Sequence, residues 1–226
     1  MKAVGRNRTR TYDHLCVRQA LYQLSYTPKK NIHVTLELSF CSRKMEELVD
    51  LKKISPRIVQ EIVYATPYNF LKKAIYPAPK CYLLSKTAER LHLAQLSLEK
   101  RGLSLKIFDA YRPLSIQKIF WSFLPDPRYI ADPAIGSKHN RGAAVDVTLI
   151  DGSGRELLMP TSFDDFSEKA HRSYALAVPL AIKNREILEE AMGAQGFLPF
   201  ETEWWHFDDP DWENYPVLDI SFEALG

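Results

Sequence analysis

The sequence predicts an α+β fold, in which a single domain holds a central antiparallel or mixed sheet flanked by helices. Residues 86–101 and 179–194 repeat apolar side chains at the spacing of one helix face. Residues 103–108 and 143–150 are short, apolar and bounded by turn residues, as strands are. Because helices and strands do not alternate regularly, we do not expect a parallel βαβ sheet.

Composition narrows the class of protein. The 226 residues are 46% hydrophobic and 26% charged, which excludes disorder of the whole chain. No run of 18 apolar residues occurs, so no membrane span is expected. The three cysteines form no CxxC pair, which argues against a zinc ribbon and a disulfide framework. We expect a cytoplasmic protein, with the periplasm as the alternative, and no obligate protein partner is evident.

The first thirty residues differ from the rest. They carry seven basic residues and one acidic residue, without the apolar run of a signal peptide. We interpret residues 1–30 as a disordered or non-native extension, with Met45 as a possible internal start and a transit peptide as the alternative. The one domain then spans residues 31–226. Outside the extension 23 basic residues face 27 acidic residues, so we expect no nucleic-acid partner.

The elements of the first half follow from local patterns. Residues 31–41 alternate apolar and polar side chains and predict a strand. Ser85 can cap a helix over 86–101, and Gly102 follows as its stop. The inward face of this helix is predicted to hold Ala88, Leu91, Ala94 or Gln95, and Leu98.

The second half is predicted in the same way. Pro113 introduces a short helix over 114–123. The helix over 179–194 is predicted to face inward with Leu180, Ile187, Leu188 and Ala191. Three further stretches are predicted to be extended, namely 197–200, 204–208 and, as a last strand, 217–222.

The first chemical context is Ser137–Asp146. On the predicted strand, Asp146 shares a face with the small side chains of Ala144 and Thr148, which leaves space before its carboxylate. His139 lies in the preceding loop, and Gly142 allows the chain to turn back. The two residues are either metal ligands or an ordinary strand acid and a surface histidine.

The second context is Glu203–Asp208. Glu203 and His206 are three residues apart, so they converge only if the chain bends at Glu203. Functionally, His206 is then a third ligand and Glu203 a base beside the metal. The alternative is a core-lining strand of aromatic residues with a charged edge.

Together the two contexts supply the parts of a zinc hydrolase. Such enzymes use three protein ligands and leave a fourth position to water, whose pKa the metal lowers to roughly 7. A neighbouring carboxylate can accept the proton and return it to the leaving amine.

A third context is Asp109–Pro113. Arg112 stands between a predicted strand and Pro113, in a stiff turn. Its guanidinium can hold the oxyanion of a tetrahedral intermediate. Alternatively, Arg112 pairs with Asp109 as a structural clamp.

These residues resemble a known family. The motif SxHxxGxAxD stands at Ser137–Asp146, ExxH at Glu203–His206 and DxYRP at Asp109–Pro113. In this order, over roughly residues 46–210, the chain resembles the D-alanyl-D-alanine dipeptidases, zinc peptidases of family M15 that share their fold with other peptidoglycan peptidases and the hedgehog signalling domain.

The resemblance implies a site and a substrate. One Zn²⁺ per chain would be bound by His139, Asp146 and His206, with Glu203 as general base and Arg112 stabilising the transition state. The substrate would be the free dipeptide D-Ala-D-Ala, in a small closed pocket that rejects longer peptides. The candidates for holding its ammonium group are Ser137, Asp164 and Asp165.

Two alternatives stay open. A carboxypeptidase or endopeptidase of the same fold would act on polymeric peptidoglycan. A non-catalytic zinc-binding module would need neither Glu203 nor Arg112.

Overall fold

The computed structural model describes residues 47–226, and the predicted strand over 31–41 and the boundary at residue 31 lie outside this range. The strands are β1 (Leu48–Asp50), β2 (Val59–Gln60), β3 (Tyr82–Leu84), β4 (Leu103–Asp109), β5 (Ala144–Asp151), β6 (Leu198–Pro199) and β7 (His206–Asp208). The α-helices are α2 (Leu51–Ile54), α3 (Ser85–Glu99), α4 (Leu114–Phe123), α5 (Pro179–Gly193) and α6 (Phe222–Leu225). Short 3₁₀ helices span Val63–Ala65, His139–Arg141, Glu168–Ala170 and Trp212–Asn214.

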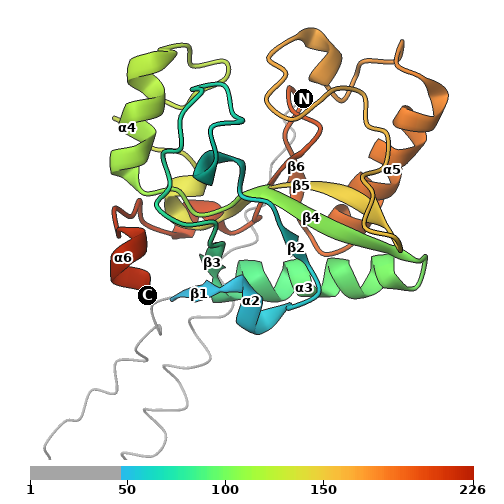
Figure 1. Ribbon diagram of the computed structural model, residues 1–226, viewed down its shortest axis with the longest axis horizontal. Coiled ribbons are helices and arrows are strands. Elements are labelled where there is room, and N and C mark those ends of the chain that lie inside the picture. Colours follow the sequence, from blue (N-terminus) through green and yellow to red (C-terminus); the bar gives the residue numbers. More distant parts are fainter. Residues whose placement is uncertain (1–46) are drawn as a thin grey trace, which may run out of the picture. The chain divides into compact units, whose positions relative to one another are not determined.

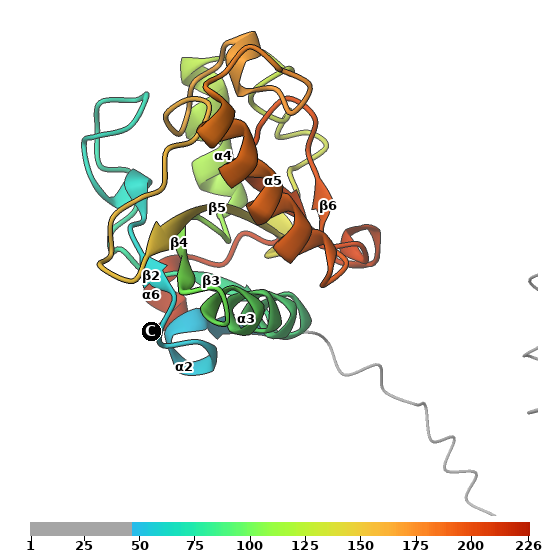
Figure 2. The ribbon, with the colours of Figure 1, turned by 90° about the vertical axis from the view of Figure 1, so that its right-hand side faces the viewer.

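A five-stranded mixed sheet organises the domain and confirms the predicted fold class. Its order is β2-β4-β5-β7-β6, in which only β2 and β4 are parallel, while β1 and β3 form a separate antiparallel pair. In both views α3 lies below this sheet, and α4 lies above it (Figures 1 and 2). The buried core is continuous across the sheet and α3.

The longest strand and one face of the helix α3 are buried. In β5, residues Ala144–Ile150 are all buried, with Val145, Val147 and Leu149 on an apolar face and Asp146 and Thr148 on the opposite face. In α3, Leu91 and Leu98 are fully buried one above the other, as the apolar spacing predicts. The helix begins at Ser85 itself, so the predicted cap at Ser85 is wrong, and Leu84 occupies the N-cap position.

Three further expectations are corrected. Leu180 is 56% exposed, because the buried face of α5 instead includes the polar residues Asn184 and Arg185. Residues 217–221 form no strand, and α6 begins at Phe222. Trp204 and Trp205 lie in a turn, so the extended segment begins only at His206.

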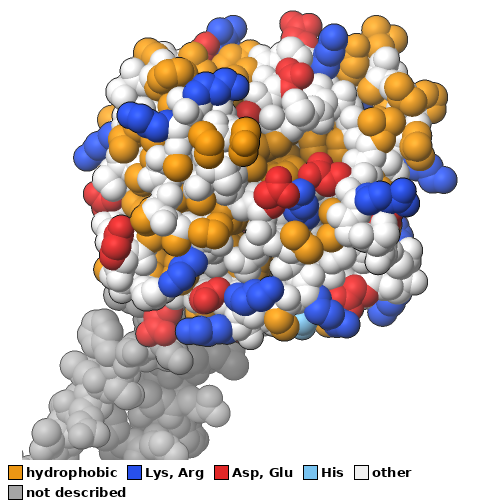
Figure 3. All heavy atoms as spheres, in the orientation of Figure 1, with side chains coloured by type: hydrophobic (Ala, Val, Ile, Leu, Met, Phe, Trp, Pro, Cys, Tyr) orange, Lys and Arg blue, Asp and Glu red, His pale blue; other side chains and the backbone are white. Residues whose placement is uncertain are grey.

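The surface carries charges of both signs. On the face drawn in Figure 3, Lys and Arg side chains and Asp and Glu side chains are interspersed. None of the helices formed by residues 47–226 has the length and apolar character needed to cross a membrane.

Candidate metal centre

Strand pairing places three functional side chains in one row. Asp109 at the end of β4 pairs with Asp146 on β5, and Asp146 pairs with His206 at the start of β7. Directly opposed residues on neighbouring strands point to the same face of a sheet. A register shift between Ile107 and Asp109 re-aims the end of β4, as bulges beside functional sites do.

His139 joins this row from the 3₁₀ helix before β5. The helix ends at Gly142, whose φ of +64° is readily adopted only by glycine. The Gly142 carbonyl accepts a hydrogen bond from the Leu84 N–H at 2.9 Å, which ties the loop to β3. The turn at Gly142 therefore returns His139 towards Asp146, as the sequence pattern indicates.

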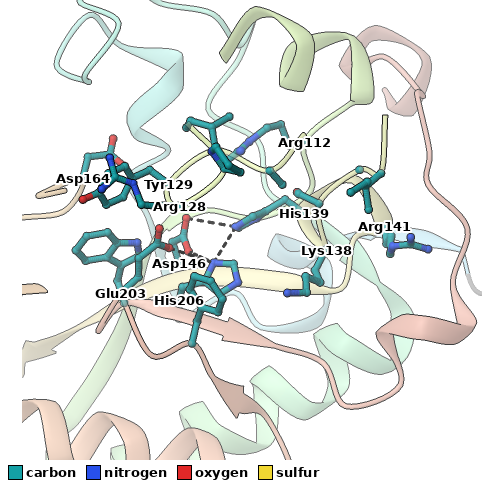
Figure 4. Close-up of a pocket in the computed structure, with 18 of the residues that line it drawn as sticks. Arg112, Arg128, Tyr129, Lys138, His139, Arg141, Asp146, Asp164, Glu203 and His206 are labelled. Carbon is teal, nitrogen blue, oxygen red and sulfur yellow. Dashed lines mark hydrogen bonds and ion pairs between the residues drawn. The ribbon is translucent and has the colours of Figure 1, made fainter. Parts of the chain in front are cut away.

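His139, Asp146 and His206 converge at one point. The His139 Nε2 and His206 Nδ1 atoms lie 3.2 Å apart, and the Asp146 carboxylate lies 2.9 Å from His206 Nδ1 and 3.5 Å from His139 Nε2 (Figure 4). All three side chains are buried. Within residues 47–226 this is the one group of three or more His, Cys, Asp or Glu ligands close enough to hold a metal ion.

Each of the two imidazoles is held by a hydrogen bond at one of its ring nitrogens. His139 Nδ1 donates to the Ala110 carbonyl at 2.7 Å, and His206 Nε2 donates to Asp208 Oδ1 at 2.9 Å. Partners of this kind fix the ring orientation of metal-ligating histidines. The remaining ring nitrogens, Nε2 of His139 and Nδ1 of His206, face each other beside the Asp146 carboxylate. Two imidazole nitrogens and one carboxylate form a donor set that suits Zn²⁺.

At His206 and Asp146, hydrogen bonds and neighbouring charges outweigh the effect of burial on the pKa. Burial disfavours the charged imidazole of His206, but hydrogen bonds to Asp146 and Asp208 outweigh burial and raise its pKa to about 10. Burial likewise disfavours the Asp146 carboxylate, but the charges and hydrogen bonds of His139 and His206 lower its pKa. The pocket thus keeps a carboxylate ionised deep inside the protein.

Glu203 lies beside this group on the loop between β6 and β7. The chain turns at residues 201–205, and the Glu203 carboxylate lies 3.7 Å from His206 Nδ1. Burial raises the pKa of Glu203 to about 7. The bend expected from the spacing of Glu203 and His206 is therefore present.

Arg112 pairs with Asp109, as one of the two alternatives for it expected, and it also lies at the cavity. Its guanidinium contacts Asp109 Oδ2 at 2.6 and 3.2 Å and donates to Gln117 Oε1 at 2.8 Å. The ring of Phe120 packs 4.4 Å from the guanidinium carbon. Arg112 also lines the cavity together with His139, Asp146 and His206 (Figure 4). The clamp to Asp109 therefore holds the guanidinium charge in place at the site.

The three candidates for binding the substrate ammonium differ in whether they line the cavity. Ser137 and Asp164 line the cavity, whose volume is about 320 Å³. Asp164 has φ +60° and accepts a hydrogen bond from the Tyr64 hydroxyl at 3.0 Å. Burial, opposed by that hydrogen bond, raises the pKa of Asp164 well above its ordinary value, and the charges of Asp146 and Glu203 add to the rise. Asp165 is not among the lining residues and accepts from the Ser167 N–H.

Some lining residues had no assigned role in the sequence. Tyr64 lies outside the three motifs, and its hydroxyl donates to Asp164. Arg128 and Tyr129 come from an irregular loop that carries no periodic signal. Lys138 stands inside the SxHxxGxAxD motif, and its ammonium lies 3.4 Å from Asp208 Oδ2.

Comparisons with known proteins agree on one family. A family profile described as D-ala-D-ala dipeptidase matches residues 44–222. The chain is 41% identical over 183 residues to the D-alanyl-D-alanine dipeptidase of Escherichia coli K12, which covers 79% of this chain and 93% of that protein. Proteins of the same name from Enterococcus faecalis V583 and Streptomyces coelicolor are 29% and 33% identical, over 70% and 64% of this chain and 89% and 82% of those proteins.

Proposed function

Because the chain belongs to the D-alanyl-D-alanine dipeptidase family, we propose that it hydrolyses the free dipeptide D-Ala-D-Ala to two molecules of D-alanine. The observation that carries the proposal is the convergence of His139, Asp146 and His206 at the wall of a cavity of about 320 Å³. A cavity of this size suits a small molecule.

The metal of the proposed enzyme is one Zn²⁺ per chain, held by His139, Asp146 and His206. The fit rests on three buried donors whose ligand atoms lie within 4.8 Å of one another, with the outer nitrogen of each imidazole already hydrogen-bonded. When bound, the ion supplies Lewis-acid activation of water and of the scissile carbonyl.

Glu203 is the general base and then the general acid. It takes a proton from the attacking water and returns that proton to the amine leaving group, so that one peptide bond and one water become two amino acids. Its pKa of about 7 supports this role, because a group that titrates near the working pH can both accept and donate a proton.

Arg112 stabilises the oxyanion that develops on the scissile carbonyl. Its guanidinium is fixed by Asp109 and Gln117, so it does not have to reorganise during the reaction. The Asp164 carboxyl group and Ser137, which both line the pocket, are the proposed partners of the substrate ammonium. Asp164 is favoured over Asp165 because Asp164 lines the cavity.

A panel of D,D-, L,D- and L,L-dipeptides, assayed together with metal analysis of the same sample, tests the proposal. We expect hydrolysis of D-Ala-D-Ala, one zinc per chain, loss of activity with a chelator and its return with added Zn²⁺. Full activity in metal-free protein contradicts the metal role. Cleavage of intact murein or blocked tripeptides with little turnover of D-Ala-D-Ala would identify a peptidoglycan carboxypeptidase or endopeptidase instead.

The compartment stays a prediction. We propose the cytoplasm, with the periplasm as the alternative, and fractionation of cells that express the full chain separates the two.

A further inference from the structure

The backbone hydrogen bonds within the loop that carries Glu203 are long. It connects β6 and β7, of which β6 has only two residues, at the edge of the sheet. Inside the loop, Glu203 N–H donates to the Phe200 carbonyl at 3.4 Å, and His206 N–H donates to the Glu203 carbonyl at 3.3 Å. At the ends of the loop, Phe200 N–H donates to the His206 carbonyl at 3.2 Å. All three distances lie at or beyond the long end of the usual 2.7–3.2 Å of backbone hydrogen bonds. A hairpin this short does not fix a side chain on its own.

Shorter bonds reach the loop from residues 170–172, outside the hairpin. Trp204 N–H donates to the Ala170 carbonyl at 3.0 Å, and Arg172 N–H donates to the Glu201 carbonyl at 2.9 Å. The Arg172 side chain adds two more, from Nε to the Phe200 carbonyl at 2.8 Å and from NH2 to the His206 carbonyl at 2.9 Å. One guanidinium therefore joins the residue at which the loop begins to the residue at which it ends.

The guanidinium of Arg172 is itself held in place. Its NH1 donates to Glu189 on α5 at 3.0 Å, and its carbon lies 4.4 Å from the ring centre of Phe207. The side chain is only 7% exposed. A charged group so buried, with every nitrogen bonded, has a defined geometry, because loss of any one bond leaves part of its buried charge uncompensated.

We infer that Arg172 is a positioning residue for the proposed reaction, which sets the Glu203 carboxylate and the His206 imidazole relative to each other by clamping both ends of the β6–β7 loop. The inference rests on the proposed roles of Glu203 and His206. Arg172 does not act on the Glu203 carboxylate or the His206 imidazole directly. It acts through the backbone carbonyls of Phe200 and His206. Misplacement of a catalytic group by about 1 Å can cost on the order of 100-fold in rate.

The test combines kinetics with hydrogen–deuterium exchange on the full chain. Arg172→Ala is expected to lower kcat for D-Ala-D-Ala by about 10- to 100-fold and to change KM by less than about threefold. In the metal-free protein, exchange of the backbone amides of residues 200–207 is expected to become faster. Millimolar guanidinium, which fits the space that the side chain leaves, should reverse both changes, whereas ammonium should not, because it lacks the planar set of donors.

Arg185 offers a matched control. It is a buried arginine of α5, and its side chain donates to the His171 and Tyr174 carbonyls instead of the loop. Arg185→Ala is expected to lower thermal stability while kcat stays within about threefold of the wild type. If Arg172→Ala does not fold, Arg172→Lys replaces it, with an intermediate loss of kcat because lysine can reach only one of the two carbonyls at a time.

Two results would overturn the inference. One is a folded Arg172 variant with kcat within about threefold of the wild type, and the other is unchanged exchange over residues 200–207. Exchange is measured without substrate or metal, so it tests the clamp independently of the proposed activity. Failure of the wild type to cleave D-Ala-D-Ala would instead reject the proposed function and leave the exchange result standing.

Discussion

At the scale of single residues, burial and charge act in opposite directions at the site. Burial raises the pKa of Glu203 to about 7, while the same burial is outweighed at Asp146 by two neighbouring imidazoles, which lower its pKa. Two carboxylates in one pocket therefore have different ionisation, which suits one to proton transfer and the other to metal binding.

Replacing Glu203 separates these two roles. Glu203→Gln keeps the shape of the side chain and removes its ability to take a proton, so kcat should fall by about 100-fold or more while zinc content is unchanged. Glu201→Gln, at an exposed position of the same loop, is the control and should stay within about twofold of the wild type. Steady-state kinetics with metal analysis measures both, and a loss of less than about tenfold at Glu203 contradicts the general-base role.

Zinc affinity should depend on pH through His206. Hydrogen bonds to Asp146 and Asp208, opposed by burial, raise its pKa to about 10, so below that pH the metal-free imidazole holds a proton that zinc must displace. The apparent affinity should therefore rise between pH 6 and pH 8, by up to about tenfold per pH unit for each proton released. Calorimetric titration in buffers of different ionisation enthalpy counts these protons, and equal affinity at both pH values would argue against ligation by His206.

At the scale of elements, periodicity predicted the regular parts and missed the irregular ones. The helix over 114–123 and the strand over 103–108 follow directly from capping and apolar spacing. The strand predicted over 217–222 is wrong because this segment finds no neighbouring strand. Its backbone instead bonds to Leu114 N–H, the Asn140 carbonyl and the Tyr111 hydroxyl, which are partners that no sequence period indicates.

Gly142 is the turn on which the position of His139 depends. A Cβ there would approach Leu48 Cδ2 to 2.6 Å and Leu84 N to 3.2 Å, in addition to the cost of a left-handed backbone. Gly142→Ala should lower the free energy of unfolding by more than the roughly 1 kcal/mol of the backbone cost alone and should weaken zinc binding. Gly154→Ala is matched in conformation, with φ +82° and no atom within 4 Å of the new Cβ.

Urea unfolding of both variants measures the difference. Because Gly154→Ala carries the backbone cost without the crowding, it should lose less stability and keep its zinc affinity. Equal losses in the two variants would show that packing at Gly142 does not contribute.

At the scale of the whole molecule, the site joins residues that are remote in the sequence. The order of the motifs predicted which residues meet, since His139, Asp146 and His206 do lie together. It did not separate Asp164 from Asp165, because the choice depends on the left-handed backbone of Asp164, for which the sequence carries no signal. Nor did it indicate Arg172, because the loop atoms to which Arg172 donates are backbone carbonyls, and every residue type has one.

Truncation tests where the active unit begins. The family match starts at residue 44, and all of the proposed site residues lie beyond it. A chain from Met45 to Gly226 should fold and keep kcat/KM within about threefold of the full chain. A chain from Ser55 is the control, because it lacks β1 and the fully buried Leu51 and should lose several kcal/mol of stability. Thermal unfolding and activity measure both, and an unfolded Met45 chain would show that the segment before it contributes to the domain.

The row formed by Asp109, Asp146 and His206 makes activity sensitive to strand pairing. A slip of β7 by one residue would turn its imidazole to the opposite side of the sheet and bring Phe207 opposite Asp146. A misregistered molecule could then be nearly native in helix content and yet inert. Specific activity per mole of folded chain consequently reports the fraction of molecules whose three inner strands are aligned, a quantity that circular dichroism of the same preparation would not reveal.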